Sequence, residues 1–117
     1  MSNDSRPAAV AGMFYPESAA LLAGTVAEML DQAATNPPLR PKAIIAPHAG
    51  YIYSGPIAAS VYAPIAVLRG SIRRVVLLGP THRVFVKGLA VPTCATFSTP
   101  LGKVALDREG IARITDL

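Results

Sequence analysis

Apolar residues recur at helical spacing in the first third of the chain. The helical face comprises Leu21, Leu22, Thr25, Val26, Met29 and Leu30. Because these positions lie on one side of a 3.6-residue repeat and Ser18 can act as an N-cap, the pattern predicts a helix over residues 19–33. The stretch "TNPPLRP" (35–41) follows, and its three prolines predict a linker.

Two short runs of consecutive apolar residues predict strands. They are "KAIIAP" (42–47) and "RRVVLLGP" (73–80), and the unbroken apolar stretch at 75–78 is typical of a parallel strand covered on both faces. Between them, residues 55–68 predict a helix with Pro56 in its first turn, kinked or ended by Pro64. Strand, helix and strand in this order predict a right-handed βαβ unit.

The last third of the chain predicts short β-type pieces, broken by Pro and Gly, over residues 88–107. Asp107 is a suitable N-cap for a final helix. A length of 117 residues suits one domain. We therefore expect an α/β fold, with a mostly parallel sheet that contains βαβ units and is covered by helices.

Composition adds that the chain is unusually apolar. Charged residues make up 15% of it, against about 25% in ordinary soluble domains, and the mean hydropathy is +0.40. No segment approaches about 18 uninterrupted apolar residues, and the N-terminus lacks a signal-peptide pattern. We therefore expect no membrane partner. The apolar residues suit a fold that buries both faces of its sheet, or a chain that is part of something larger.

Charge and cysteine content restrict the partners and the compartment. The formal net charge is +4, but the basic residues are scattered, so no nucleic-acid partner is expected. The single cysteine, Cys94, excludes an intrachain disulfide, which fits a cytoplasmic location.

The two histidines of the chain occupy equivalent places. His48 follows the first predicted strand in "APHAG", and His82 follows the second in "GPTHR". Ligands of open parallel sheets bind beyond the carboxyl ends of the strands, so both imidazoles could reach one metal ion or substrate oxygen. The alternative is two unrelated surface histidines. Two histidines alone do not define a metal site, no carboxylate has a telling spacing, and Cys94 is typical of a small buried hydrophobic residue.

Four of the residues that follow His48 in the sequence are further candidates for the site. Tyr51 or Tyr53 could donate a hydrogen bond to a bound oxygen, or could simply pack with the hydroxyl at a rim. Ser54 and Gly55 lead into the predicted helix, whose N-terminus could bind an anion, or Ser54 could only cap it.

Four sequence blocks resemble the N-terminal portion of the Memo family, whose bacterial members are also called AmmeMemoRadiSam system protein B. The blocks are "RPAAVAGMFYP", "KAIIAPHAGYIYSGPIAASVY", "VVLLGPTH" and "FSTPLGKVALD". The resemblance implies a fold similar to class III extradiol dioxygenases of the LigB type. It also implies a redox metal, Fe(II) or Cu, held by two histidines and a cysteine; the histidines match His48 and His82. The position after the second histidine, often histidine in the family, is Arg83.

The resemblance implies that the family's ligand cysteine lies in a C-terminal half, which we expect to be absent from residues 1–117. We therefore expect residues 1–117 to be the N-terminal part of a single Memo-like domain, with half a metal site and no tightly bound metal. The expected function is that of a metal-dependent redox protein resembling extradiol dioxygenases. The alternative is a metal-free binding module for an anionic peptide or metabolite, since Memo proteins are associated with phosphopeptide binding. A third hypothesis is an inactive chain that self-associates.

Overall fold

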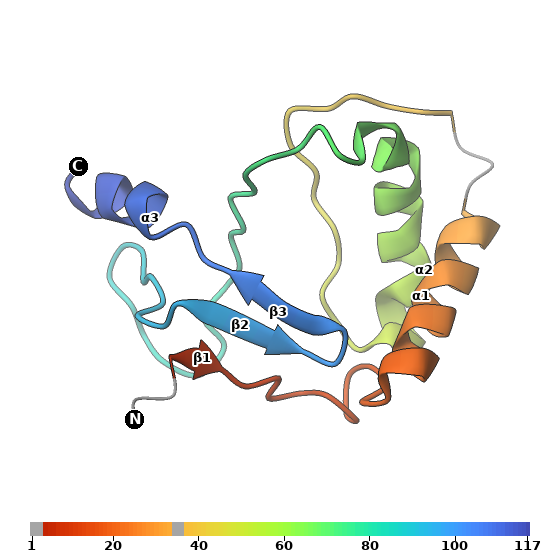
Figure 1. Cartoon of the computed structure of the whole chain (residues 1–117), viewed down its shortest axis with the longest axis horizontal. Helices are drawn as coiled ribbons and strands as arrows, with labels where there is room; N and C mark the ends of the chain where they lie inside the picture. Colours follow the sequence, from red (N-terminus) through yellow and green to blue (C-terminus); the bar gives the residue numbers. More distant parts are fainter. Residues whose placement is uncertain (1–3, 34–36) are drawn as a thin grey trace.

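The computed structural model describes residues 4–33 and 37–117. Two helices, α1 and α2, lie side by side at one end of the molecule, and a small sheet and the helix α3 lie towards the other end (Figure 1). Two long extended segments connect these parts. Of the predicted linker, residues 35 and 36 lie outside the described residues, and residues 37–41 form no helix or strand.

Helix α1 (Ala19–Gln32) confirms the predicted helix to within one residue. The Ser18 hydroxyl accepts a hydrogen bond from the Leu21 backbone N–H at 3.4 Å, as expected of an N-cap. Leu22, on the apolar face, is buried, and so is Ala59 of α2.

Helix α2 (Tyr51–Tyr62) begins four residues earlier than the sequence predicted, with Gly50 as N-cap. Pro56 therefore lies inside the helix, not in its first turn. The missing Pro56 N–H would have bonded the carbonyl of Ile52, which is in an exposed residue where water can satisfy it. The predicted effect of Pro64 is confirmed, since regular α-helix gives way to the 3₁₀-helix η1 (Ala63–Leu68).

The contact between α1 and α2 requires a glycine. A Cβ atom placed on Gly55 would lie 2.7 Å from the Sδ atom of Met29, closer than atoms can pack without movement. The backbone of α2 can approach α1 this closely because position 55 has no side chain.

The sheet is small and mixed. It comprises β1 (Ser5–Arg6), β2 (Thr96–Thr99) and β3 (Gly102–Ala105) in that order, with β1 parallel and β3 antiparallel to β2. β2 and β3 confirm the predicted β-type pieces. The positive φ of 129° at Gly102 closes the turn between them.

The predicted mostly parallel sheet and its βαβ unit are wrong in this structure. Residues 42–47 and 73–80 are extended but pair with no strand in the described part of the chain. Local sequence sets the extended backbone, whereas a strand also needs a neighbour. The structure nevertheless confirms an α/β fold, with helices and a small mixed sheet.

The continuous helix from Tyr51 to Leu68 is the one described helix that could span a bilayer by length and composition. Its 18 residues have a mean hydropathy of 1.3. Only 17% of this window is buried, and one helix that meets a criterion of length and composition is weak evidence for a membrane span.

Helix α3 (Arg108–Thr115) has the predicted N-cap. The Asp107 carboxylate accepts a hydrogen bond from the Gly110 N–H at 2.9 Å and forms an ion pair with Arg74, next to the apolar run 75–78. The backbone hydrogen bond from Gly110, followed by the charge of Arg74, lowers the pKa of Asp107 below its usual 3.8. One carboxylate therefore both caps α3 and anchors an extended segment.

We predict that Asp107→Ala frays α3, giving several-fold faster hydrogen exchange at the Gly110 amide. Acid should have the same effect. A lowered pKa means that the carboxylate's contribution to folding is present above the unfolded pKa and is lost as pH falls through the folded value, below 3.8. Asp116→Ala, at the other end of α3, is the control. Equal exchange in the Asp107 and Asp116 variants would contradict the cap.

Candidate histidine site

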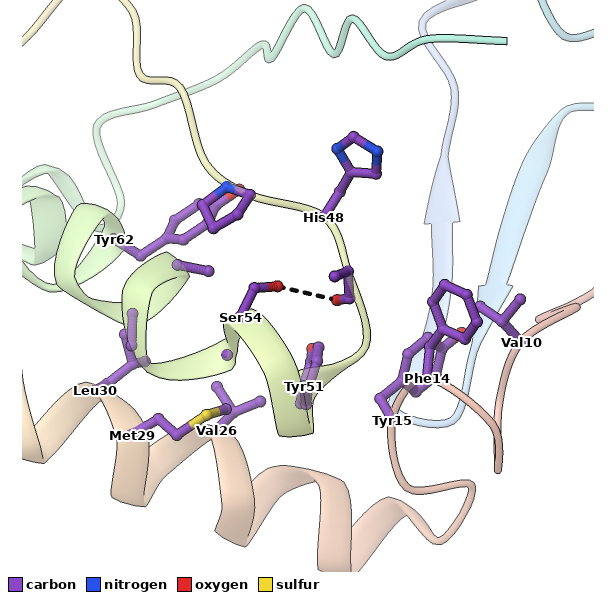
Figure 2. A pocket seen from close by; sticks show the side chains of 15 residues that line it. Val10, Phe14, Tyr15, Val26, Met29, Leu30, His48, Tyr51, Ser54 and Tyr62 are labelled. Carbon is purple, nitrogen blue, oxygen red and sulfur yellow. Dashed lines mark hydrogen bonds between the residues drawn. The ribbon is translucent and has the colours of Figure 1, made fainter. Parts of the chain in front are cut away.

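His48 lies in a turn that is fixed from two sides. The Tyr51 N–H, at the start of α2, donates to the carbonyl of Phe14 at 2.8 Å. The Ser54 hydroxyl donates to the carbonyl of Ala49 at 3.2 Å (Figure 2). The turn between Pro47 and α2 is thus tied both to the N-terminal loop and to the helix that follows.

His82 reaches the same point from a distant part of the sequence. It follows the extended segment 73–80, and its Nε2 atom lies 3.2 Å from Nε2 of His48. The ring centroids are 5.3 Å apart and the planes are inclined by 54°. The structure therefore brings the two histidines together, although the parallel-strand edge that was expected to position them is not formed.

A nitrogen–nitrogen distance of 3.2 Å is compatible with two kinds of interaction. One neutral imidazole can donate its Nε2–H to the other. Alternatively, both Nε2 atoms can bind one metal ion: with metal–nitrogen bonds of about 2.1 Å, they would subtend an angle of about 100°. That angle lies between those of octahedral and tetrahedral coordination, so the pair already has the spacing of two adjacent metal ligands.

A third protein ligand is not found among the described residues. No group of three His, Cys, Asp or Glu side chains there is placed to hold a metal ion. Cys94 is a half-buried free cysteine in the loop before β2, and its carbonyl accepts a hydrogen bond from Arg108. Both imidazoles are exposed, so solvent or another group can occupy further coordination positions.

A largely apolar cavity of about 560 Å³ lies beside this turn. Figure 2 shows His48 at its rim, with the ring directed away from α1 and α2. The volume is within the range of small-molecule sites. The lining consists of Val10, Phe14, Tyr15, Val26, Met29, Leu30, Pro47, His48, Ala49, Tyr51, Ser54, Gly55, Ala58, Ala59 and Tyr62.

The two candidate tyrosines differ in position. Tyr51 lines the cavity, whereas Tyr53 does not and is 83% exposed. Burial, followed by the neighbouring Tyr15 and Tyr62, raises the pKa of Tyr51 above its usual 10.0, so its phenol stays a hydrogen-bond donor at neutral pH. The Tyr15 ring lies 5.7 Å from that of Tyr51. Sequence reasoning missed Tyr15 and Tyr62 as neighbours of the site, although both lie in the quoted sequence blocks, because only the folded packing brings them to Tyr51.

The helix boundary that suggested an anion site at Ser54 and Gly55 is wrong. The helix begins at Tyr51, so these residues lie within it: Ser54 bonds Ala49, and Gly55 is buried against Met29. The exposed N–H groups of a helix N-terminus belong to its first turn. Anion binding at Ser54 and Gly55 stays a prediction.

The fold and the paired histidines define a mixed α/β protein with a two-imidazole centre beside an apolar cavity. The family model described as "Memo-like protein" matches residues 6–117, so the chain belongs to the Memo family. This confirms the resemblance read from the four sequence blocks.

Two relatives illustrate how far the similarity extends. A MEMO1 family protein of Aquifex aeolicus is 40% identical over 104 residues, which cover 89% of this chain and 37% of the relative. Protein MEMO1 of Xenopus laevis is 40% identical over 112 residues, which cover 93% of this chain and 36% of the relative. The chain therefore spans less than two fifths of the length of these relatives.

The raised pKa of Tyr51 predicts a phenol that ionises above pH 10. Because the folded state holds this proton more tightly, its contribution to stability is present below pH 10 and is lost as pH rises through the folded pKa. In a titration followed by phenolate absorbance, Tyr51→Phe should remove a component that titrates above pH 10. Tyr53→Phe is the control. If Tyr53→Phe removes the component above pH 10 and Tyr51→Phe does not, the burial of Tyr51 is contradicted.

Proposed function

We propose that the His48 and His82 pair is a redox-metal site for Fe(II) or Cu, in a protein resembling extradiol dioxygenases. The observation that carries this proposal is the 3.2 Å separation of the two Nε2 atoms. Imidazole nitrogens suit both metals, and two histidines with further positions open are a common donor set for non-haem iron. When bound, such an ion would supply one-electron chemistry.

The chain's own contribution would be binding and orientation. His48 and His82 would hold two adjacent coordination positions through Nε2. Two neutral donors without a charged third ligand bind weakly, so the metal should exchange readily in this chain. The third ligand that the family resemblance implies is not among the described residues.

The cavity beside His48 favours an apolar organic substrate. Its lining is largely aliphatic and aromatic, and Tyr51 contributes a neutral phenol that can donate a hydrogen bond to a substrate in the cavity. Tyr51 is therefore the better of the two tyrosine candidates for orienting a substrate. The exposed Tyr53 would act only on a group outside the cavity.

The second candidate function is a metal-free module that binds an anionic peptide or metabolite, such as a phosphopeptide. The net charge of +4 supports it. The two proposals differ in what the histidines do, so metal binding separates them. A cytoplasmic location stays a prediction under both.

The test is a Cu(II) titration of the full chain followed by electron paramagnetic resonance. We expect weak binding, with nitrogen splitting from two imidazoles, that a modest excess of chelator removes. His48→Ala should weaken the affinity by roughly tenfold or more, and His82→Ala by the same amount. Because the two ligands act as a unit, the double variant should lose little further affinity.

Cys94→Ser is the matched control and should bind copper as the unaltered chain does. Independent, additive losses in the two histidine variants would refute a shared site. Absence of copper binding, together with saturable binding of a phosphopeptide, would favour the binding module.

A further inference from the structure

A second cavity lies at the far end of the continuous helix that begins beside His48. Its volume is about 380 Å³, within the range of small-molecule sites. The helix runs from residue 51 to residue 68, so roughly 25 Å of helix separates this cavity from the histidine turn. Much of its lining is aliphatic and comes from three places: Leu30 of α1, Ile65 and Leu68 of η1, and Ile72 in the segment that follows.

One guanidinium group is available at this cavity. Among the described residues that line it, Arg69 alone is charged. Arg69 is exposed and forms no ion pair within the described part of the chain, whereas Arg74 is paired with Asp107. The carboxylate of Asp31, next to Leu30 in α1, neither lines the cavity nor pairs with Arg69. The cavity therefore combines an apolar interior with one unneutralised positive charge.

The turn that carries Arg69 is fixed by its own hydrogen bonds. The Arg69 N–H donates to the carbonyl of Ala66 at 3.0 Å. The N–H and the hydroxyl of Ser71 both donate to the carbonyl of Leu68, at 3.0 and 2.7 Å. Gly70 has a φ of 80°, which lets the chain reverse there. These bonds satisfy two carbonyls at the end of the helix that would otherwise disfavour an anion, and they leave the Arg69 side chain free.

We propose that this cavity binds an amphipathic carboxylate, with its apolar tail against Leu30 and Ile65 and its head group on Arg69. A guanidinium can bind a carboxylate through two parallel N–H···O bonds, which add direction to the attraction of opposite charges. The aliphatic lining favours the tail, because binding removes apolar surface of both partners from water. This site is separate from the His48 and His82 pair and does not depend on the function proposed for it.

The test is a titration of the full chain with octanoate, below its critical micelle concentration, followed by methyl resonances in NMR spectra. We expect the methyl signals of Ile65, Leu68 and Ile72 to shift in a saturable way, because these residues line this cavity and not the one beside His48. Octanol has the tail without the charge, octylammonium has the opposite charge, and acetate has the head group without the tail. Each should bind about tenfold more weakly or less well still.

Matched variants test the role of the guanidinium. Arg69→Gln should weaken octanoate binding about tenfold or more, and Arg69→Lys, which keeps the charge without the planar fork, should weaken it less. Arg73→Gln makes the same change in net charge outside the lining and should bind as the unaltered chain does. Because the Arg69 side chain is exposed and unpaired in the described structure, helical circular dichroism should be the same in all three variants.

A further variant tests the place of the tail. Ala66→Leu adds a larger side chain to the lining at an exposed helical position, so it should reduce octanoate affinity without unfolding η1.

Three results would overturn the proposal. Octanol could bind as tightly as octanoate, which would show that no anionic head group is recognised. Arg73→Gln could weaken binding as much as Arg69→Gln does, which would reduce the effect to net charge. Finally, the methyl signals of Ile65, Leu68 and Ile72 could stay unchanged at saturating octanoate, which would place any binding outside this cavity.

Discussion

The hydrogen bond from the Tyr51 N–H to the Phe14 carbonyl joins the two parts of the molecule on which the place of His48 depends. It ties the N-terminal loop to the first residue of α2, and so fixes the turn that carries His48. Gly55 then allows α2 to lie close against Met29 of α1. Because the turn is held by a helix and a loop, His48 keeps its place although residues 42–47 belong to no strand. The cavity and the raised pKa of Tyr51 follow from the same packing.

Local features of this fold could be predicted from the sequence, and non-local ones could not. Helix α1, its Ser18 cap and the Asp107 cap depend on residues within one turn, and the structure has all three. The strand prediction for 73–80 failed because a strand needs a neighbour, and no described segment pairs with it. The start of α2 was misplaced because Pro56 was read as a first-turn signal. Proline inside a helix leaves the carbonyl four residues earlier without its donor. The sequence could not show that this carbonyl, in Ile52, belongs to a residue that is exposed to water.

The candidate site shows the same division. Equivalent positions after two apolar runs were enough to predict that His48 and His82 meet, and their Nε2 atoms are 3.2 Å apart. The roles of Tyr51 and Tyr53 could not be separated from sequence, because burial depends on the neighbours Tyr15 and Tyr62.

We propose that the imidazoles of His48 and His82 share one ligand through their Nε2 atoms. The most direct measurement is a long-range proton–nitrogen correlation spectrum of the histidine rings during titration with Zn²⁺, which is redox-silent and accepts imidazole ligands. We expect the Nε2 resonances of His48 and His82 to shift together, with the same midpoint, while both Nδ1 resonances change little. Shifts of only one ring, or different midpoints for the two rings, would contradict a shared site.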